Sequence, residues 1–409
     1  MVRKLAESLN RPAATKGLLF NFAGVLSRKN MAWGGKIAMT NRYGKPEKGN
    51  KGLTLGSVIE VSVVSPEVNK EGAQFALDQT PEVQAALVSI DPRTGGIKAM
   101  VGGYDFKKSQ FNRAMQAKRN AGSAFKPIIY AAALDKGLTP ATIIEDAPVE
   151  YPDGAGGIWK PQNYDHEFRG RVAMREALTY SINIVSVKIM EQIGAQYAAE
   201  YAQKLGFTSP IPANLALALG AASISPYELT SAYAVFANNG MLNSQYFITK
   251  VTDTDGTVLQ ETPPSVPVPV ISPETAYVIT NLMQSVVSSG TGHRASIIGR
   301  PVAGKTGTTN GSKDAWFVGY VPQLVTGVWV GYDQERSLGS GGTGGQAAAP
   351  IWGDFMQKAI LSLPAEEFHA PENVSFVLIN PRTGRLAREG TAGAVMECFI
   401  KGTEPSSYD

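Results

Sequence analysis

Apolar and polar residues alternate with a period of two in the first part of the chain. Ile59, Val61 and Val63 fall on one face of an extended segment and Glu60 on the other, as in a half-buried strand. Turn-forming clusters separate this run from similar ones, so residues 1–83 are predicted to form a small all-β unit. The strands predicted in it span residues 37–42, 58–64 and 74–77.

After this unit the pattern changes to strand, tight turn, strand. Residues 85–90 and 96–101 flank a turn, and residues 376–379 and 385–388 flank a matching turn near the other end of the chain. The segments between the two hairpins differ, so an internal duplication is not indicated. One sheet with strands from both ends of the domain is the simpler prediction.

Helix signals dominate between the hairpins. Ser225 and Glu228 form a capping box with proline at the first helical position, and Gly240 is expected to end that helix. A central sheet between helical layers, with an all-helical insertion, follows, and the fold class is α/β (α+β). Helices are predicted over residues 127–134, 175–193 with an interruption at 181–183, 226–240, 273–287 and 348–361, and strands over 300–309 and 315–332.

Composition excludes several classes of function. The 409 residues are 43% apolar and 18% charged with a net charge of +3, which indicates a globular chain without the basic surface of a nucleic-acid-binding protein. One cysteine and three scattered histidines argue against a metal site, and no cofactor is expected. No apolar run reaches the roughly 18–20 residues of a membrane span.

We assign residues 1–83 to an oligonucleotide/oligosaccharide-binding (OB)-like β domain or a β-rich linker, and residues 84–409 to a second domain.

Candidate chemistry begins with Ser123 and Lys126, the only Ser-x-x-Lys in the chain. The apolar run that follows predicts a buried helix with both residues on one face near its first turn. A serine hydroxyl becomes nucleophilic when a base takes its proton, and a buried lysine with a lowered pKa can be that base. Such a pair is also common on apolar helices without a catalytic role, so this motif alone does not establish a nucleophile.

Two further motifs follow in order, Ser181-x-Asn183 and Lys-Thr-Gly at residues 305–307. Attack on an amide needs a proton route to the leaving amine, which Ser181 can supply, while Asn183 can hold the substrate amide. Lys305 is predicted to point to the serine cluster, which consists of Ser123 and Ser181, and to lower the pKa of Lys126 by its charge. Each motif has an ordinary explanation too, because Ser181 and Asn183 can break a helix and Lys305 can protect an edge strand.

The strand that contains the third motif is expected to bind the substrate. Thr306 and Thr308 share one face, where their hydroxyls can bind a terminal carboxylate. Gly307 between them is expected to let the substrate backbone approach closely. The backbone N–H groups of Ser123 and Thr308 are the candidates for stabilising a tetrahedral oxyanion.

Three segments carry alternatives. Residues 299–306 also satisfy the Walker A pattern, but a phosphate loop must open a helix and a turn follows here, so a P-loop nucleotide site is the remote alternative. Residues 159–166 are expected to form a surface loop rather than to line a cleft. Residues 290–292 form either a second loop beside the site that binds the substrate carboxylate or simply the end of a helix.

The ordered triple of motifs resembles that of class A penicillin-binding proteins. The resemblance covers residues 84–409, includes the run Ser225-Pro226-Tyr227-Glu228-Leu229, and departs from the family pattern at Ile182, where aspartate is usual. Residues 1–83 resemble, more weakly, a small β domain of some Gram-negative members. The resemblance implies a transpeptidase fold with a central antiparallel sheet, and a D,D-transpeptidase whose Ser123 attacks the penultimate D-Ala of a peptidoglycan stem peptide.

The same resemblance implies partners and a location. Peptidoglycan stem peptides and β-lactam antibiotics would bind, nucleic acid would not, and other cell-wall synthesis proteins are further candidate partners. The protein would act at the periplasmic face of the bacterial inner membrane, with the membrane anchor and glycosyltransferase domain absent from this chain. A serine β-lactamase or a D,D-carboxypeptidase shares the motifs and remains the main alternative.

Overall fold

The computed structural model describes residues 24–26, 60–69, 72–78, 81–152 and 156–409, and the chain divides into two compact units, residues 1–82 and 83–409. In the first unit three strands pair in the order β1-β3-β2. They are β1 (Gly24–Leu26), β2 (Glu60–Asn69) and β3 (Gly72–Asp78). The last two correspond to the predicted strands 58–64 and 74–77, and the predicted strand 37–42 lies outside the described residues. The OB-like assignment stays a prediction.

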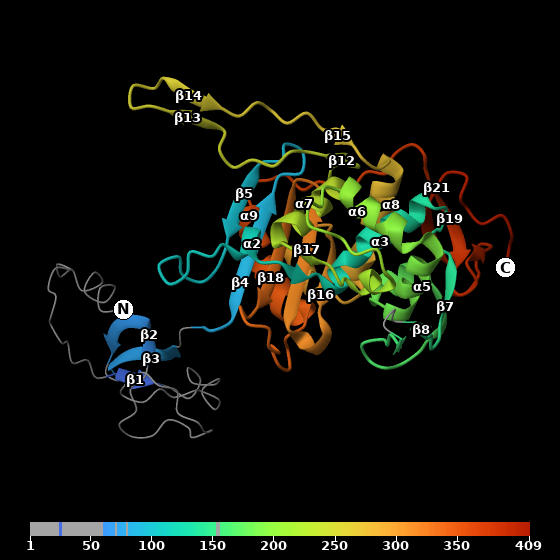
Figure 1. Ribbon diagram of the computed structural model, residues 1–409, viewed down its shortest axis with the longest axis horizontal. Coiled ribbons are helices and arrows are strands. Elements are labelled where there is room, and N and C mark those ends of the chain that lie inside the picture. The colour runs from blue at the N-terminus through green and yellow to red at the C-terminus, as the bar shows by residue number, and fades with distance from the viewer. Residues whose placement is uncertain (1–23, 27–59, 70–71, 79–80, 153–155) are drawn as a thin grey trace. The chain divides into compact units, whose positions relative to one another are not determined.

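The second unit is built around a five-stranded antiparallel sheet in the order β16-β17-β18-β4-β5 (Figure 1). Its strands are β4 (Gln84–Ile90), β5 (Ile97–Val101), β16 (Ala303–Thr308), β17 (Asp314–Val321) and β18 (Leu324–Gly331). The first hairpin thus pairs with strands from much later in the chain, and the helical segments fall between them in sequence. β16 forms one edge of the sheet.

Helices cover both faces of this sheet. Along β17, Trp316 and Tyr320 pack into the larger core with the helical layer, whereas Phe317 and Val321 join a second core around Trp352 of α9. β17 and β18 are therefore buried along their whole length. The helices are α2 (Arg113–Gln116), α3 (Lys126–Asp135), α4 (Met174–Thr179), α5 (Asn183–Ile193), α6 (Ala195–Lys204), α7 (Pro226–Ala237), α8 (Pro273–Ser288) and α9 (Ala349–Ala359).

The prediction that the two hairpins share a sheet is wrong. The second hairpin forms a separate sheet in the order β20-β19-β21, made of β19 (Val374–Asn380), β20 (Arg385–Leu386) and β21 (Val395–Ile400). Its place is set by contacts with helices that are distant in the sequence. Phe376 packs edge-on against Tyr277 of α8 with ring centroids 6.3 Å apart, and Glu397 pairs with Arg175 of α4.

Local signals set the ends of some helices. Both halves of the Ser225–Glu228 capping box are formed, and α7 ends shortly before Gly240, which has a φ of 85°. The 175–193 segment consists of two helices with the predicted interruption between them. Short paired strands complete the unit: β6 (Arg119–Asn120) with β11 (Ser223–Ile224), β7 (Ile143–Asp146) with β10 (Gly170–Ala173), β8 (Tyr151–Pro152) with β9 (Ile158–Trp159), β12 (Met241–Leu242) with β15 (Val268–Pro269), and β13 (Lys250–Thr252) with β14 (Val258–Glu261).

Residues 299–306 do not form a phosphate loop. Lys305 and Thr306 lie inside strand β16, and a short 3-10 turn at Asn310–Ser312 follows instead of an α-helix. The turn contains Gly311 at a φ of 70°, so it cannot continue as a helix. Across the described ranges, no helix has both the length and the apolar character needed to cross a bilayer.

Candidate active site

Ser123 lies on a tight turn that leads into α3. Gly122–Phe125 form a 3-10 turn, and α3 continues from Lys126 with Pro127 in its first turn. Gly122 has a φ of 55°, and a Cβ on it would lie 2.7 Å from the carbonyl oxygen of Thr308. Glycine at residue 122 therefore allows the edge strand β16 to lie this close to the turn with Ser123, which we call the serine turn.

The amine of Lys126 is directed to the second motif. Its Nζ lies 2.7 Å from Ser181 O, 2.8 Å from Asn183 Oδ1 and 3.3 Å from Ser181 Oγ. Burial, with a smaller contribution from the charge of Lys305, holds the pKa of Lys126 well below its ordinary value. Within the part of the chain that the structure describes, no hydrogen bond joins Lys126 Nζ to the Ser123 hydroxyl.

Ser181 lies where the two lysine side chains meet. It occupies the break between α4 and α5 with a φ of 60°, a left-handed conformation that is uncommon outside glycine. Its Oγ accepts hydrogen bonds from Lys305 Nζ at 2.9 Å and from Lys126 Nζ at 3.3 Å. Lys305 therefore points to the serine cluster, as its place in the strand predicted.

Asn183 is oriented from two sides. Its Oδ1 accepts a hydrogen bond from Lys126, and its Nδ2 donates to the carbonyl oxygen of Gln162 at 2.9 Å. A flipped amide would place its N–H groups against the amine of Lys126 and its oxygen against a carbonyl, so only one orientation satisfies both neighbours. One N–H and one oxygen lone pair are left for a ligand.

The third motif lies on β16 at the free edge of the central sheet. Lys305 is fully buried, and this burial lowers its pKa to about 7. Thr306 and Thr308 fall on the opposite face of the strand. The hydroxyl of Thr306 lies 2.6 Å from that of Thr291, and the hydroxyl of Thr308 accepts a hydrogen bond from the backbone N–H of Gly344 at 3.0 Å.

Gly307 allows another part of the chain to lie close to β16. A Cβ on it would lie 2.5 Å from Ala121 O and 2.9 Å from Ala124 Cβ. The turn with Ser123 thus occupies the space that a side chain at residue 307 would need, and Gly307 allows this turn to pack against β16. The close approach of a substrate backbone to Gly307 stays a prediction.

The backbone N–H of Thr308 points away from the neighbouring strand. Thr309 N donates to Asp314 O at 3.2 Å, and hydrogen-bonded pairs alternate along an antiparallel ladder. Thr308, which is opposite Ala315, therefore directs its N–H to the free edge of β16. The serine turn packs against this same stretch of strand, so the two predicted oxyanion donors belong to adjacent segments.

These groups meet at one cavity of about 950 Å³. Its wall includes five of the predicted site residues: Ser123, Ser181, Asn183, Thr306 and Thr308. Lys126 and Lys305 are fully buried and reach this wall through Ser181. The three motifs, far apart in sequence, thus converge.

Both loops left open by the sequence line the same cavity. Residues 160–166 form a loop in which Tyr164 is 72% exposed and Asn163 is buried. Residues 159–166 also form part of the cavity wall, so the prediction that they do not line the cleft is wrong. Thr291 lines the cavity as well and bonds to Thr306. This contact favours the alternative in which residues 290–292 form a loop beside the predicted carboxylate-binding site.

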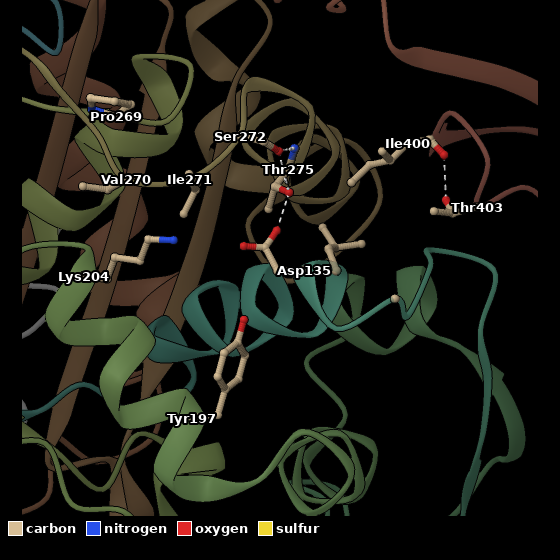
Figure 2. Close-up of a pocket in the computed structure, with 12 residues that line it drawn as sticks. Asp135, Tyr197, Lys204, Pro269, Val270, Ile271, Ser272, Thr275, Ile400 and Thr403 are labelled. Carbon is tan, nitrogen blue, oxygen red and sulfur yellow. Dashed lines mark hydrogen bonds between the residues drawn. The ribbon is translucent and has the colours of Figure 1, made fainter.

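A second hollow, of about 750 Å³, lies at the other end of α3 and is lined by Asp135, Tyr197 and Lys204 among others (Figure 2). α3 has 10 residues, which span about 15 Å at 1.5 Å per residue. The hydroxyl of Ser272, also in the hollow, accepts a hydrogen bond from the backbone N–H of Thr275 and caps α8. This hollow therefore lacks an available serine–lysine pair, and the larger cavity is the candidate for the chemistry.

One residue with contacts to the second motif was not predicted from the sequence. Asn163 Oδ1 accepts hydrogen bonds from the backbone N–H groups of Asn183 and Ile184 at 2.9 and 3.1 Å. No sequence spacing links residue 163 to residue 183, and the only signal is the polar, turn-forming composition around it. Among residues with described positions, no group of three or more His, Cys, Asp or Glu side chains could hold a metal ion.

Comparison with known proteins identifies the family. Residues 85–357 match the penicillin binding protein transpeptidase domain. Penicillin-binding protein 1A of Neisseria lactamica is 44% identical over 315 residues, which are 75% of this chain and 40% of that protein. Penicillin-binding protein 1A of Pseudomonas aeruginosa is 39% identical over 392 residues, 83% of this chain and 48% of that protein. The chain thus spans less than half the length of these relatives.

Solved structures agree with this assignment. The crystal structure of penicillin-binding protein 1A from Haemophilus influenzae matches with a TM-score of 0.79 at 33% identity, over 88% of this chain and 58% of that one. The PonA1 protein from Mycobacterium tuberculosis in complex with penicillin V matches with a TM-score of 0.64 at 30% identity, over 72% of this chain and 82% of that one. The predicted fold, a central antiparallel sheet between helical layers, is confirmed. The chain belongs to the penicillin-binding protein transpeptidase family.

Proposed function

We propose that this protein is a serine-type D,D-transpeptidase that cross-links peptidoglycan stem peptides and is acylated by β-lactams. The observation that carries the proposal is the contact of one hydroxyl, that of Ser181, with the buried amines of Lys126 and Lys305 beside the half-buried Ser123. Two amines with lowered pKa around serine hydroxyls are suited to proton transfer in acyl exchange.

Ser123 is the nucleophile in this proposal, and Lys126 is its base. Ser123 Oγ attacks the carbonyl carbon of the penultimate D-Ala while its proton passes to the neutral amine of Lys126. A neutral Nζ keeps two N–H groups, enough for its short contacts with Ser181 O and Asn183 Oδ1, and has a lone pair for the incoming proton. These contacts hold the amine in place during the transfer.

Collapse of the tetrahedral intermediate breaks the bond to the terminal D-Ala. Its amine takes a proton from the Ser181 hydroxyl, and the proton held by Lys126 replaces it through their 3.3 Å contact. An amine of a neighbouring stem peptide then attacks the carbonyl carbon of the acyl-enzyme and gives a proton through Ser181 to Lys126. The ester bond to Ser123 breaks, and Lys126 returns the proton to Ser123 Oγ. The remaining N–H of Asn183 can bind the backbone of the donor peptide.

Backbone and hydroxyl donors complete the site. The N–H groups of Ser123 and Thr308 form the proposed oxyanion hole. Thr306 and Thr308 bind the terminal carboxylate, with Thr291 as a further hydroxyl beside Thr306. The nearby positive charge of Lys305 favours an anionic ligand at this end of the cavity.

The substrate sets the proposed location. Peptidoglycan is assembled outside the cytoplasmic membrane, so we place the activity at its periplasmic face. Other cell-wall synthesis proteins are proposed partners, and the first unit is proposed to be an OB-like domain. A β-lactamase or a D,D-carboxypeptidase would share the acylation step and differ in passing the acyl group to water.

Covalent labelling tests the proposal. Incubation with penicillin should add the mass of one penicillin to the intact protein, and peptide mapping should place it on Ser123. Ser123→Ala should take no label, while Ser288→Ala, a change at an exposed serine of α8, should label like the parent. Equal labelling of Ser123→Ala would refute the nucleophile, and loss of the parent's adduct within seconds would favour a β-lactamase. Transfer of a stem-peptide acyl group to an added amine would separate transpeptidation from hydrolysis.

A further inference from the structure

The start of α5 has no cap of its own. Ile182 is the residue before the helix, and its side chain can accept no hydrogen bond from the first backbone N–H groups. These are the N–H groups of Asn183 and Ile184, next to the proposed proton carrier Ser181. The side chain of Asn163, from a loop 20 residues earlier in the chain, accepts both of them.

Asn163 is itself held in one orientation. It is 3% exposed, and its Nδ2 donates to the carboxylate of Asp146 at 2.8 and 2.9 Å and to the carbonyl oxygen of Glu167 at 2.7 Å. Asp146 is 1% exposed and also accepts the backbone N–H of Arg169 at 2.9 Å. The amide nitrogen of Asn163 thus faces only acceptors and its oxygen faces only donors, so a flipped amide would lose every bond.

The neighbouring residue of the same loop holds the Asn183 side chain. The carbonyl oxygen of Gln162 accepts from Asn183 Nδ2 at 2.9 Å. Two adjacent residues therefore hold both the backbone and the side chain of Asn183. Because Ser181 is two residues away in a left-handed conformation, its hydroxyl position depends on where α5 begins.

We propose that Asn163, held by the buried carboxylate of Asp146, is a positioning residue that places Ser181 and Asn183 for acyl transfer. The inference rests on the proposed function, because it concerns the rate of the same acylation. Asn163 acts through the start of α5 and touches neither reacting atom. Its loss should lower the acylation rate constant about 10- to 100-fold, the effect of a small misplacement of a catalytic group. The noncovalent affinity for penicillin should change less.

An exchange of the two side chains tests this role. Asn163→Asp alone places two carboxylates against each other, and Asp146→Asn alone removes the anion that orients Asn163. In the double variant N163D/D146N, aspartate accepts the N–H groups of α5 and asparagine donates to its other oxygen, so the repulsion between two carboxylates is removed, although the bond to the carbonyl oxygen of Glu167 is lost. We expect the double variant to acylate faster than either single variant. Asn243→Ala, at another buried asparagine that bonds to the carbonyl oxygens of Pro92 and Arg93, is the matched control for loss of a buried amide.

The measurements are the acylation rate constant and noncovalent affinity with a fluorescent penicillin, and the thermal midpoint of each variant. A slow Asn163→Ala, rescue in the double variant and normal acylation by Asn243→Ala would support the positioning role. If Asn163→Ala acylates within twofold of the parent, or the double variant is no faster than Asn163→Asp, the inference fails. If Asn163→Ala does not fold, the acylation rate constants of the double variant and of Asn163→Asp test the positioning role. A parent that takes no label would defeat the proposed function and this inference with it.

Discussion

Lys305 Nζ lies 2.9 Å from the hydroxyl oxygen of Ser181, although 124 residues separate them in the chain. Lys126 Nζ, from the first residue of α3, lies 3.3 Å from the same oxygen. One neutral hydroxyl thus joins two buried amines, each of which is destabilised as a cation by burial. Proton exchange through Ser181 is what this arrangement favours, and the charge state of the pair should control both the rate and the stability of the protein.

The acylation rate should rise with pH, because Lys126 acts as a base only when it is neutral. Lys305→Met removes the positive neighbour that helps to lower the pKa of Lys126, so the acid side of the pH–rate profile should move to higher pH. At pH 7 we expect the variant to acylate about 10- to 100-fold more slowly. Rate constants for penicillin acylation from pH 5 to pH 10 check this. Lys358→Met, at an exposed lysine of α9, is the control, and superimposable profiles for Lys305→Met and the parent would contradict the prediction.

Stability should also depend on pH through Lys305. Its pKa is about 7 in the folded protein against an ordinary value of 10.5, so between these values the unfolded chain binds more protons. The free energy of unfolding therefore rises with pH in this window, by at most about 1.4 kcal/mol per pH unit for one group. In Lys305→Met this contribution should disappear. Denaturant titrations of both proteins at pH 7, 8 and 9 measure the difference, and a difference that does not change with pH would count against a lowered pKa.

Gly307→Ala should separate the serine turn from the edge strand. Its Cβ would meet Ala121 O at 2.5 Å, so backbone must move, at a cost of about 1–3 kcal/mol in unfolding free energy. Acylation of Ser123 should fall at least tenfold, since the nucleophile moves relative to Lys126. Gly299→Ala also strains the backbone, at a φ of 65°, but has no atom within 4 Å of the added Cβ, and it should acylate normally. Normal acylation by Gly307→Ala would show that the turn tolerates the shift.

Glu228 should stabilise the fold without touching the chemistry. Burial by itself would raise its pKa, but hydrogen bonds from Lys118, Ser225 and Ser209 together bring the pKa far below its ordinary value. Glu228→Gln should therefore lower the unfolding free energy at pH 7 by about 1.5–3 kcal/mol.

The deficit of Glu228→Gln should shrink as the pH falls below 4.5, the ordinary pKa of the group, because the stabilisation depends on the ionised carboxylate. Unfolding curves at pH 7, 5 and 3 check the sign. Glu261→Gln, at an exposed glutamate of β14, should change little. A constant deficit over this range would mean that packing, and not charge, explains the loss.

Much of the fold could be predicted because its signals are local. The capping box at Ser225, the proline in the first turn of α3 and the interruption at Ser181 each act within a few residues along the backbone. The serine–lysine pair was predictable for the same reason. The pattern near residue 380 predicts a hairpin but not the sheet it belongs to, since that depends on contacts such as that of Phe376 with Tyr277.

By itself the sequence determined the elements, their order and the three motifs, since helix starts, strand periods and turns depend on interactions between near neighbours. Only the tertiary structure decided that Lys305 and Lys126 share the hydroxyl of Ser181, that Gly307 receives the serine turn, and that Asn163 caps α5. These contacts join residues far apart in the chain. They form only when the packed core places β16, α3 and the loop of residues 160–169 around one cavity. No short-range pattern in the sequence encodes that placement.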